Sequence, residues 1–262
     1  MDHTQLADQY TEFDDEYWWF VGRRKIFTAL LEKYLVYPNK TNLKILDVGC
    51  GTGGNSKALT QFGDVCAIDY SLTALNHARE RRINKLINCS ALNLPFRPET
   101  FDIIAVLDIL AYFKDDVQVL DEIRSSLKKD GTVIISVPAF QSLWSNHDEA
   151  VRHLRRYNSK CLIKAIRDSG LQHLRISYFV SFVFPFLALY RIMTRRLKLD
   201  KRTDAKTDLF RLPIFIDKTL RQILFFESKI LRRGNLPFGL SLLCIAKNDP
   251  TSTKINEIVN RR

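Results

Sequence analysis

A short apolar run that leads directly into a cluster of glycines constrains the fold of this chain most strongly. Residues 43–48 (LKILDV) are mostly apolar, and GCGTGG follows at once. Gly49, Gly51 and Gly54 fit the spacing G-x-G-x-x-G, which lets a backbone turn tightly after a strand and approach a ligand at a helix N-terminus. The pattern therefore predicts a strand, a tight loop and a helix around a ligand.

Further apolar runs of strand length alternate with helical patterns along the chain. Strands are expected at 64–69, 86–89, 101–107, 132–137, 171–178 and 240–247, and helices at 22–37, 55–62, 116–127, 159–169 and 213–233, with one more that begins after Ser71. Such alternation is typical of parallel strands wrapped by helices. We therefore expect an α/β fold with a doubly wound, mostly parallel seven-stranded sheet whose last strand is antiparallel.

The 262 residues, of which 46% are hydrophobic, suffice for one core with additional segments. The expected organisation is an N-terminal helical cap over 1–40, a ligand-binding core over 41–180, a basic and aromatic helical insertion over 181–236, the last core strand over 237–250 and a C-terminal tail over 251–262. The insertion should begin at the rim that bears the glycine loop, because parallel strands end on the same edge of a sheet.

Basic residues are concentrated in the second half of the chain. The formal net charge is +11, but residues 1–150 contain 16 basic and 21 acidic residues, whereas residues 151–262 contain 24 and 8. Residues 181–236 contain 13 basic and 5 acidic residues, interleaved with aromatic ones. This mixture indicates a lid over an apolar or anionic acceptor, an element that rests on anionic lipid, or a helical cap with solvated arginines.

The sequence predicts neither export nor a membrane span. The longest apolar run, 176–190, is interrupted by two serines and a proline and falls short of the roughly 20 residues that a spanning helix needs. The N-terminal residues lack the order of a signal peptide, and the five cysteines form no C-x-x-C pair. We expect a cytoplasmic protein, either free of membranes or associated with one. Its thiols should be free, and no metal site is expected. The oligomeric state is not indicated.

Two acidic residues beside the glycines narrow the choice of ligand. Asp69 ends the second expected strand about 20 residues past the glycine loop, where an acid accepts hydrogen bonds from a ribose diol. Dinucleotide oxidoreductases and S-adenosylmethionine enzymes both use such an acid. Asp47 lies two residues before the first glycine, where a carboxylate suits the amino group of a methionine tail, so the second class is favoured.

The ordered set ILDVGCGTGG, AIDYS, ALNLPFRPETFD and LKKDGTVIISVP resembles the class I S-adenosylmethionine-dependent methyltransferases, which have a Rossmann-like fold, over roughly residues 43–180. Three outer segments, YWWFVGRR, LWSNHDEAVRHLRRY and LPFGLSLLCIAK, are similar to a bacterial subgroup, methyltransferase type 11-like, with the motif W-S-x-H-D-x(4)-H-x-R-R-Y. That subgroup often accompanies genes for envelope polysaccharides and specialised metabolites. The resemblance implies S-adenosylmethionine as cofactor and favours a small-molecule or lipid-linked sugar as acceptor.

The resemblance also implies a set of cofactor-binding residues. These are Gly49, Cys50 and Gly51 along the methionine part, Asp69 on the ribose hydroxyls, Tyr70 beside the adenine, Ala91 and Leu92 at the adenine edge, Leu107 and Asp108 at the ammonium, and Arg23 on the methionine carboxylate with Trp19 in the covering aromatic cluster. Ser90 stands where the family often has an acid that binds the adenine amine, which weakens that one assignment.

A base is needed if the acceptor is a hydroxyl or an ammonium, because the acceptor must lose a proton as the methyl group is transferred. His147 and His153 follow the fifth expected strand, on the rim of the glycine loop. We take His147 as the candidate general base and His153 as the second candidate. The alternative is that both histidines pack or form hydrogen bonds structurally.

The expected function is methyl transfer from S-adenosylmethionine to a small-molecule or lipid-linked saccharide, on oxygen if a histidine is the base. The alternatives are a peripheral-membrane lipid or quinone-type methyltransferase, an RNA methyltransferase, and a non-catalytic methyltransferase-like binding protein. The fourth strand ends in LDIL, without the Asn/Asp-Pro-Pro-aromatic tetrad used on flipped bases, so a nucleic-acid partner is not expected. The sequence leaves open the acceptor, the methylated atom and the contact made by the basic insertion.

Overall fold

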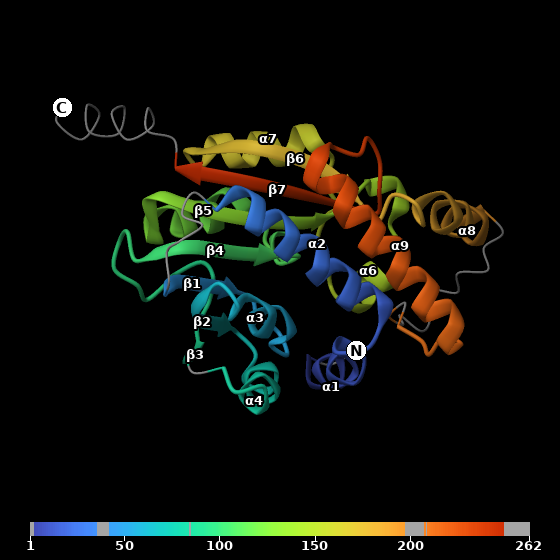
Figure 1. Cartoon of the computed structure of the whole chain (residues 1–262), viewed down its shortest axis with the longest axis horizontal. Helices are drawn as coiled ribbons and strands as arrows, with labels where there is room; N and C mark the ends of the chain where they lie inside the picture. Colours follow the sequence, from blue (N-terminus) through green and yellow to red (C-terminus); the bar gives the residue numbers. More distant parts are fainter. Residues whose placement is uncertain (1–2, 36–41, 84, 197–206, 208, 249–262) are drawn as a thin grey trace.

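A seven-stranded sheet organises the chain (Figure 1) in a computed structural model that describes residues 3–35, 42–83, 85–196, 207 and 209–248. The strands are β1 (Leu43–Val48), β2 (Gly63–Asp69), β3 (Lys85–Asn88), β4 (Phe101–Leu107), β5 (Leu127–Pro138), β6 (Leu171–Phe179) and β7 (Ser241–Asn248). Their order is β3-β2-β1-β4-β5-β7-β6, and β7 runs antiparallel between β5 and β6. The expected fold class, with six parallel strands and an antiparallel last one, is confirmed.

The helices are α1 (His3–Asp14), α2 (Trp18–Tyr34), α3 (Gly54–Leu59), α4 (Leu72–Glu80), α5 (Asp116–Ser126), α6 (Asn146–Ala150), α7 (Ser159–Asp168), α8 (Phe184–Arg196) and α9 (Ile214–Arg233), with 3-10 turns η1 (Leu110–Tyr112) and η2 (Gln141–Leu143). Ser71 caps α4 as expected, since its Oγ accepts a hydrogen bond from the Ala74 N–H at 3.3 Å. Helices α1, α6 and α8 were not predicted. The C-terminal tail expected over 251–262 lies outside the described residues.

Two element boundaries differ clearly from the expected ones. The helix expected over 22–37 begins four residues earlier, at Trp18, because the backbone N–H of Trp18 donates to Asp217 Oδ1 of α9 at 2.8 Å, a cap that comes from a distant part of the chain. Strand β5 begins at Leu127 instead of residue 132, because Leu127 already pairs with Phe101 across a register irregularity.

Each face of the sheet is covered by its own helices. Helices α2, α3, α4 and α9 bury apolar side chains against one face, and α5 and α7 cover the other. Figure 1 shows α2 and α9 crossing the same face side by side. The N-terminal cap and the insertion, separated by about 200 positions in sequence, thus form one layer over the core.

The close approach of α2 and α9 depends on Gly22. A Cβ at this position would lie 2.2 Å from Leu224 Cδ1 and 2.7 Å from Leu224 Cβ. We expect Gly22→Ala to lower the free energy of unfolding by about 1–3 kcal/mol, because the overpacking exceeds the gain in helix propensity of about 1 kcal/mol. Urea unfolding measures the change. The cost should shrink in a Leu224→Ala background, and full stability of Gly22→Ala would contradict the close contact.

Candidate functional site

The glycine loop joins β1 to α3 at the edge where the parallel strands end. The N–H groups of Gly49 and Cys50 donate to the Ile68 carbonyl at 2.8 and 2.9 Å, which ties the loop to β2. Gly49, Gly51 and Gly53 have φ of +69°, +54° and +84°, in the left-handed region that favours glycine. The third glycine with a positive φ is therefore Gly53, whereas the G-x-G-x-x-G spacing predicted Gly54.

The loop leaves a space that faces the end of β2. A Cβ at Gly51 would meet no atom within 4 Å, so the backbone is open to a ligand there. Asp69 borders this space, and its carboxylate accepts hydrogen bonds from the Gly51 N–H at 2.9 Å and the Ser71 N–H at 2.8 Å. Tyr70 follows and is 83% exposed, which presents an aromatic face beside the strand end. Ala91, which is buried, and Leu92, which is half-buried, follow the neighbouring strand β3.

Asp47 is almost fully buried beneath the loop, with 1% of its surface exposed. Burial raises the pKa of its carboxyl group from 3.8 to about 7, although the Ser56 hydroxyl donates a hydrogen bond to Oδ2 at 2.5 Å and lowers it in part. The neighbouring carboxylate of Asp69 raises the pKa further. A carboxylate in such surroundings is stabilised by an added cation, which is the chemistry expected at the amino group of a methionine tail.

Cys50 and Leu107 are buried, at 6% and 8% exposure. Burial raises the pKa of the Cys50 thiol well above its ordinary value, with a further increase from Asp47 and Asp69. The thiol is therefore not a nucleophile. Its contribution at the loop is through its backbone, as the resemblance implies for this position.

Arg23 of α2 and Asp108, which follows β4, form an ion pair across the strand ends. Ser136 of β5 completes the group, because its Oγ donates to Asp108 Oδ1 at 2.9 Å. The guanidinium also lies over the Trp19 ring at 5.3 Å from the centroid. The resemblance implies that Arg23 binds the carboxylate of the methionine tail and Asp108 its ammonium. In the structure the two side chains pair with each other instead. Asp108 has φ of +64°, an uncommon conformation for a residue that is not glycine.

Sequence reasoning missed Asp14, the last residue of α1. Its buried carboxylate accepts hydrogen bonds from Thr52 Oγ1 at 3.0 Å and from Arg24 Nη1 at 2.5 Å, and it pairs with Arg81 Nη2 at 3.1 Å. A Cβ at Gly54 would lie 2.2 Å from its Oδ2. Asp14 thus fixes α1 to the glycine loop. No local sequence signal marks this contact, because its partners come from three distant segments.

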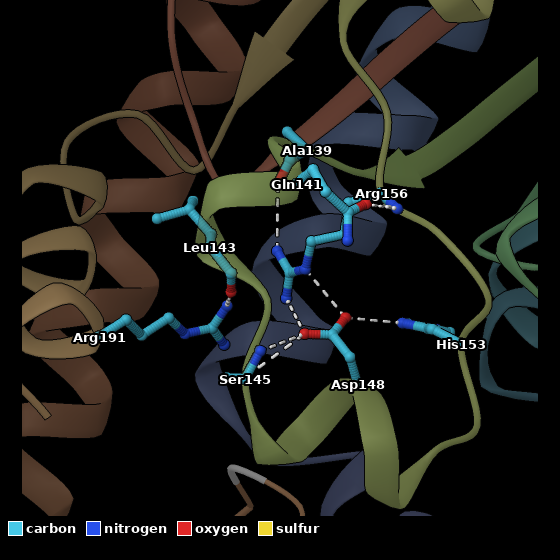
Figure 2. Close-up of polar contacts among 8 residues, drawn as sticks. All are labelled: Ala139, Gln141, Leu143, Ser145, Asp148, His153, Arg156 and Arg191. Atoms are coloured by element: carbon cyan, nitrogen blue, oxygen red, sulfur yellow. Dashed lines mark hydrogen bonds and ion pairs between the residues drawn. The ribbon is translucent and has the colours of Figure 1, made fainter. Parts of the chain in front are cut away.

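A second polar group lies after β5 and centres on Asp148 (Figure 2). Its side chain is completely buried and accepts two hydrogen bonds from Arg156, Nε to Oδ1 at 2.9 Å and Nη2 to Oδ2 at 2.8 Å. The Ser145 N–H donates to Oδ2 at 2.9 Å, and His153 Nδ1 lies 3.0 Å from Oδ1. Burial opposes the charge, but the contacts with His153 and Arg156 prevail and hold the pKa of Asp148 well below its ordinary value.

Of the two predicted histidines, His153 is the one that Asp148 orients. Its side chain is 8% exposed, whereas His147 is half-buried on α6, with its ring centroid 6.4 Å away. The ring of Tyr112 packs edge-on against His153 at 5.0 Å. The side chain of Tyr112 is exposed. Tyr112, which was not predicted as a site residue, therefore borders the histidine group.

Residues 46–135 match the sequence model of a methyltransferase domain. This match spans the glycine loop, Asp69, Asp108 and the part of β5 that precedes Ser136. The chain therefore carries a methyltransferase domain over these residues. S-adenosylmethionine is its cofactor, and the open backbone at Gly51 and the orientation of the Asp69 carboxylate fit that ligand.

Two relatives and one solved structure illustrate the extent of the similarity. An uncharacterised protein of Methanocaldococcus jannaschii is 27% identical over 67% of this chain and 76% of its own length. The demethylmenaquinone methyltransferase of Staphylococcus aureus is 30% identical over 40% of this chain and 50% of its own. A putative methyltransferase solved with the Haloferax volcanii activator Trm112 has a TM-score of 0.59 at 16% identity, over 94% of this chain and 97% of that one. The last likeness concerns the fold.

The methyltransferase domain match stops within β5, before Asp148 and His153. The alignment with the Staphylococcus aureus relatives spans about half of their length. Asp148, His153 and the two outer helical segments therefore lie outside the matched domain.

Proposed function

We propose that this methyltransferase transfers a methyl group to a hydroxyl oxygen of a small-molecule or lipid-linked saccharide, with His153 as the general base. When bound, S-adenosylmethionine supplies a methyl group activated by a positively charged sulfur. The observation that carries the proposal is the buried Asp148–His153 pair, which packs against Tyr112 beside the strand ends. A hydroxyl is a poor acceptor until its proton is removed, and this pair offers a base in the right place.

The division of labour around the cofactor follows from the positions of the side chains. The glycine loop would hold the methionine part through its backbone, Asp69 the ribose hydroxyls, and Tyr70 with Ala91 and Leu92 the adenine. Asp47 would meet the amino group from below. Arg23 would pair with Asp108 and hold it in place at the same end of the cofactor, with Trp19 covering the guanidinium.

His153 would accept the acceptor's proton on Nε2. Asp148 accepts from Nδ1, which fixes the tautomer and the orientation of the ring and stabilises the cation that forms. Arg156 keeps Asp148 ionised, so the carboxylate does not take the proton itself. His147, the first choice from sequence, lies next to this pair, and we assign it a secondary position in the acceptor pocket.

A quinone-type acceptor is the second candidate. The similarity to the demethylmenaquinone methyltransferase of Staphylococcus aureus supports it, since that protein's name states a quinone substrate. Methyl transfer would then be to a ring carbon: His153 would remove the proton of a ring hydroxyl, the carbon would take the methyl group, and the proton on that carbon would move to the hydroxyl oxygen and restore the aromatic ring. The two candidates differ in the atom that receives the methyl group.

A labelling experiment separates these candidates. The protein would receive ¹³C-methyl S-adenosylmethionine with one acceptor at a time: a polyprenyl-diphosphate-linked sugar, a sugar nucleotide, demethylmenaquinone or an RNA pool. We expect an O-methyl resonance on a saccharide. A C-methyl resonance on the quinone would instead establish the second candidate, and a labelled RNA would contradict both. Absence of S-adenosylmethionine binding in calorimetry would leave only a non-catalytic binding role.

A further inference from the structure

Helix α8 exposes a continuous apolar stripe at the surface of the protein. Phe186, Leu189, Tyr190 and Met193 are 76%, 58%, 64% and 51% exposed, and their spacing places them on one face of the helix. The opposite face packs inward, since Ala188 is buried. Isolated exposed apolar side chains are common, whereas several on one helical face form a patch of the kind that binds another surface.

The outer face of α9 continues this surface and adds positive charge. Phe215, Lys218, Gln222, Phe226 and Lys229 are all exposed and follow one another at helical spacing. Phe226 lies 6.0 Å, centroid to centroid, from Phe182, the exposed residue just before α8. The segment that leads into α8 thus contacts α9, and the outer face of α9 is both apolar and cationic.

Buried polar contacts hold this surface at the rim of the catalytic domain. Glu227 of α9, completely buried, accepts hydrogen bonds from the Val180 N–H at 2.5 Å and the Ser181 N–H at 2.9 Å, in the turn that ends β6. Arg191 of α8 donates to the Leu143 carbonyl at 3.1 Å, in the segment that leads to Asp148 (Figure 2). Figure 1 shows α8 at the end of the molecule toward which the parallel strands point. The surface and the proposed acceptor site therefore share one edge.

We propose that the outer faces of α8 and α9 dock the protein on an anionic lipid surface. The charge of this surface favours lipid over a protein partner, because Lys218 and Lys229 are exposed beside Phe215 and Phe226 on the outer face of α9. An amphipathic helix with Phe and Leu on one face and basic residues around it inserts shallowly at the headgroup boundary, where anionic lipids add attraction. No helix among the described residues is both long and apolar enough to cross a membrane, so the contact would be peripheral.

Vesicle flotation tests the docking directly. The probes are phosphatidylcholine vesicles with and without phosphatidylglycerol, and the full chain is used without any acceptor. We expect the protein to float with the anionic vesicles, to bind neutral ones at least tenfold more weakly, and to be released as salt is raised. The triple variant Phe186→Ser, Leu189→Ser and Met193→Ser should lose at least tenfold of the partition onto anionic vesicles.

The control variant replaces exposed leucines elsewhere, Leu72→Ser on α4 and Leu174→Ser on β6, and should float like the parent. Calorimetry with S-adenosylmethionine should give equal affinities for all variants, which shows that they are folded. Flotation unaffected by the triple change, or no flotation of the parent, would overturn the proposal. So would a dimer that the triple variant converts to a monomer without any lipid binding. Each outcome is independent of the acceptor, so a failure here would leave the proposed methyl transfer intact.

Discussion

His153→Gln should lower kcat for methyl transfer to a hydroxyl acceptor by about 10²–10⁴-fold, because the variant cannot take the acceptor's proton. Its affinity for S-adenosylmethionine should stay within about threefold of the parent's, because the ring contacts Asp148 and Tyr112 instead of the glycine loop. Single-turnover assays with saturating cofactor measure the change.

A purely structural histidine would behave differently, so the experiment includes three comparisons. His173→Gln, on an exposed position of β6, controls for loss of a histidine as such. His147→Gln should cost less than tenfold if His153 is the base, and the reverse ranking would restore the first choice made from sequence. Added imidazole should raise the rate of His153→Ala. An unchanged rate in His153→Gln would exclude it as the base.

Much of the core could be predicted because its signals are local. Strand β1 occupies residues 43–48 as expected, since a short apolar run bounded by glycines has few alternatives. The capping side chain of Ser71 and the bounds of β4 are local in the same way. One helix could also have been predicted from a local signal. Ser145 and Asp148 form a capping box at the start of α6, and the spacing S-x-x-D indicates such a helix start.

The contacts that were not predicted are those between distant segments. Helix α1 is held in part by polar contacts with distant residues, among them the hydrogen bond of Asp8 with His77 and the ion pair of Asp15, just after the helix, with Arg81. Local sequence gives no sign of these partners. The Arg23–Asp108 pair joins residues 85 positions apart. Sequence placed both residues at the site, but the pairing itself depends on how α2 crosses the sheet, which local pattern does not encode.

Asp47→Asn should weaken the binding of S-adenosylmethionine about 10–100-fold at pH 8, if its carboxylate meets the cofactor's ammonium as proposed. A hydrogen bond to a charged group contributes about 1.5–3 kcal/mol, and the amide keeps the size of the side chain and an oxygen that can accept from Ser56. Calorimetry across pH gives a second readout. The parent's affinity should rise as pH increases through about 7, where Asp47 loses its proton, and the variant should lack this dependence.

The same substitution should stabilise the protein without cofactor. Because the pKa of Asp47 is raised from 3.8 to about 7 on folding, the folded state retains a proton that the unfolded state releases. The free energy of unfolding of the parent therefore falls between about pH 4 and pH 7, and the full penalty is present above pH 7. Asp47→Asn should be more stable than the parent by roughly 2–4 kcal/mol at pH 8 and equal to it near pH 4.

Urea unfolding at both pH values measures this difference, with Asp64→Asn at an exposed acid of β2 as the matched control. A variant that is no more stable at pH 8 would contradict the buried environment assigned to Asp47. A variant that is more stable yet binds the cofactor as tightly as the parent would confirm the burial and remove Asp47 from the cofactor site. Greater stability together with weaker binding would show that the Asp47 carboxylate lowers the stability of the free protein and contributes to binding of the cofactor.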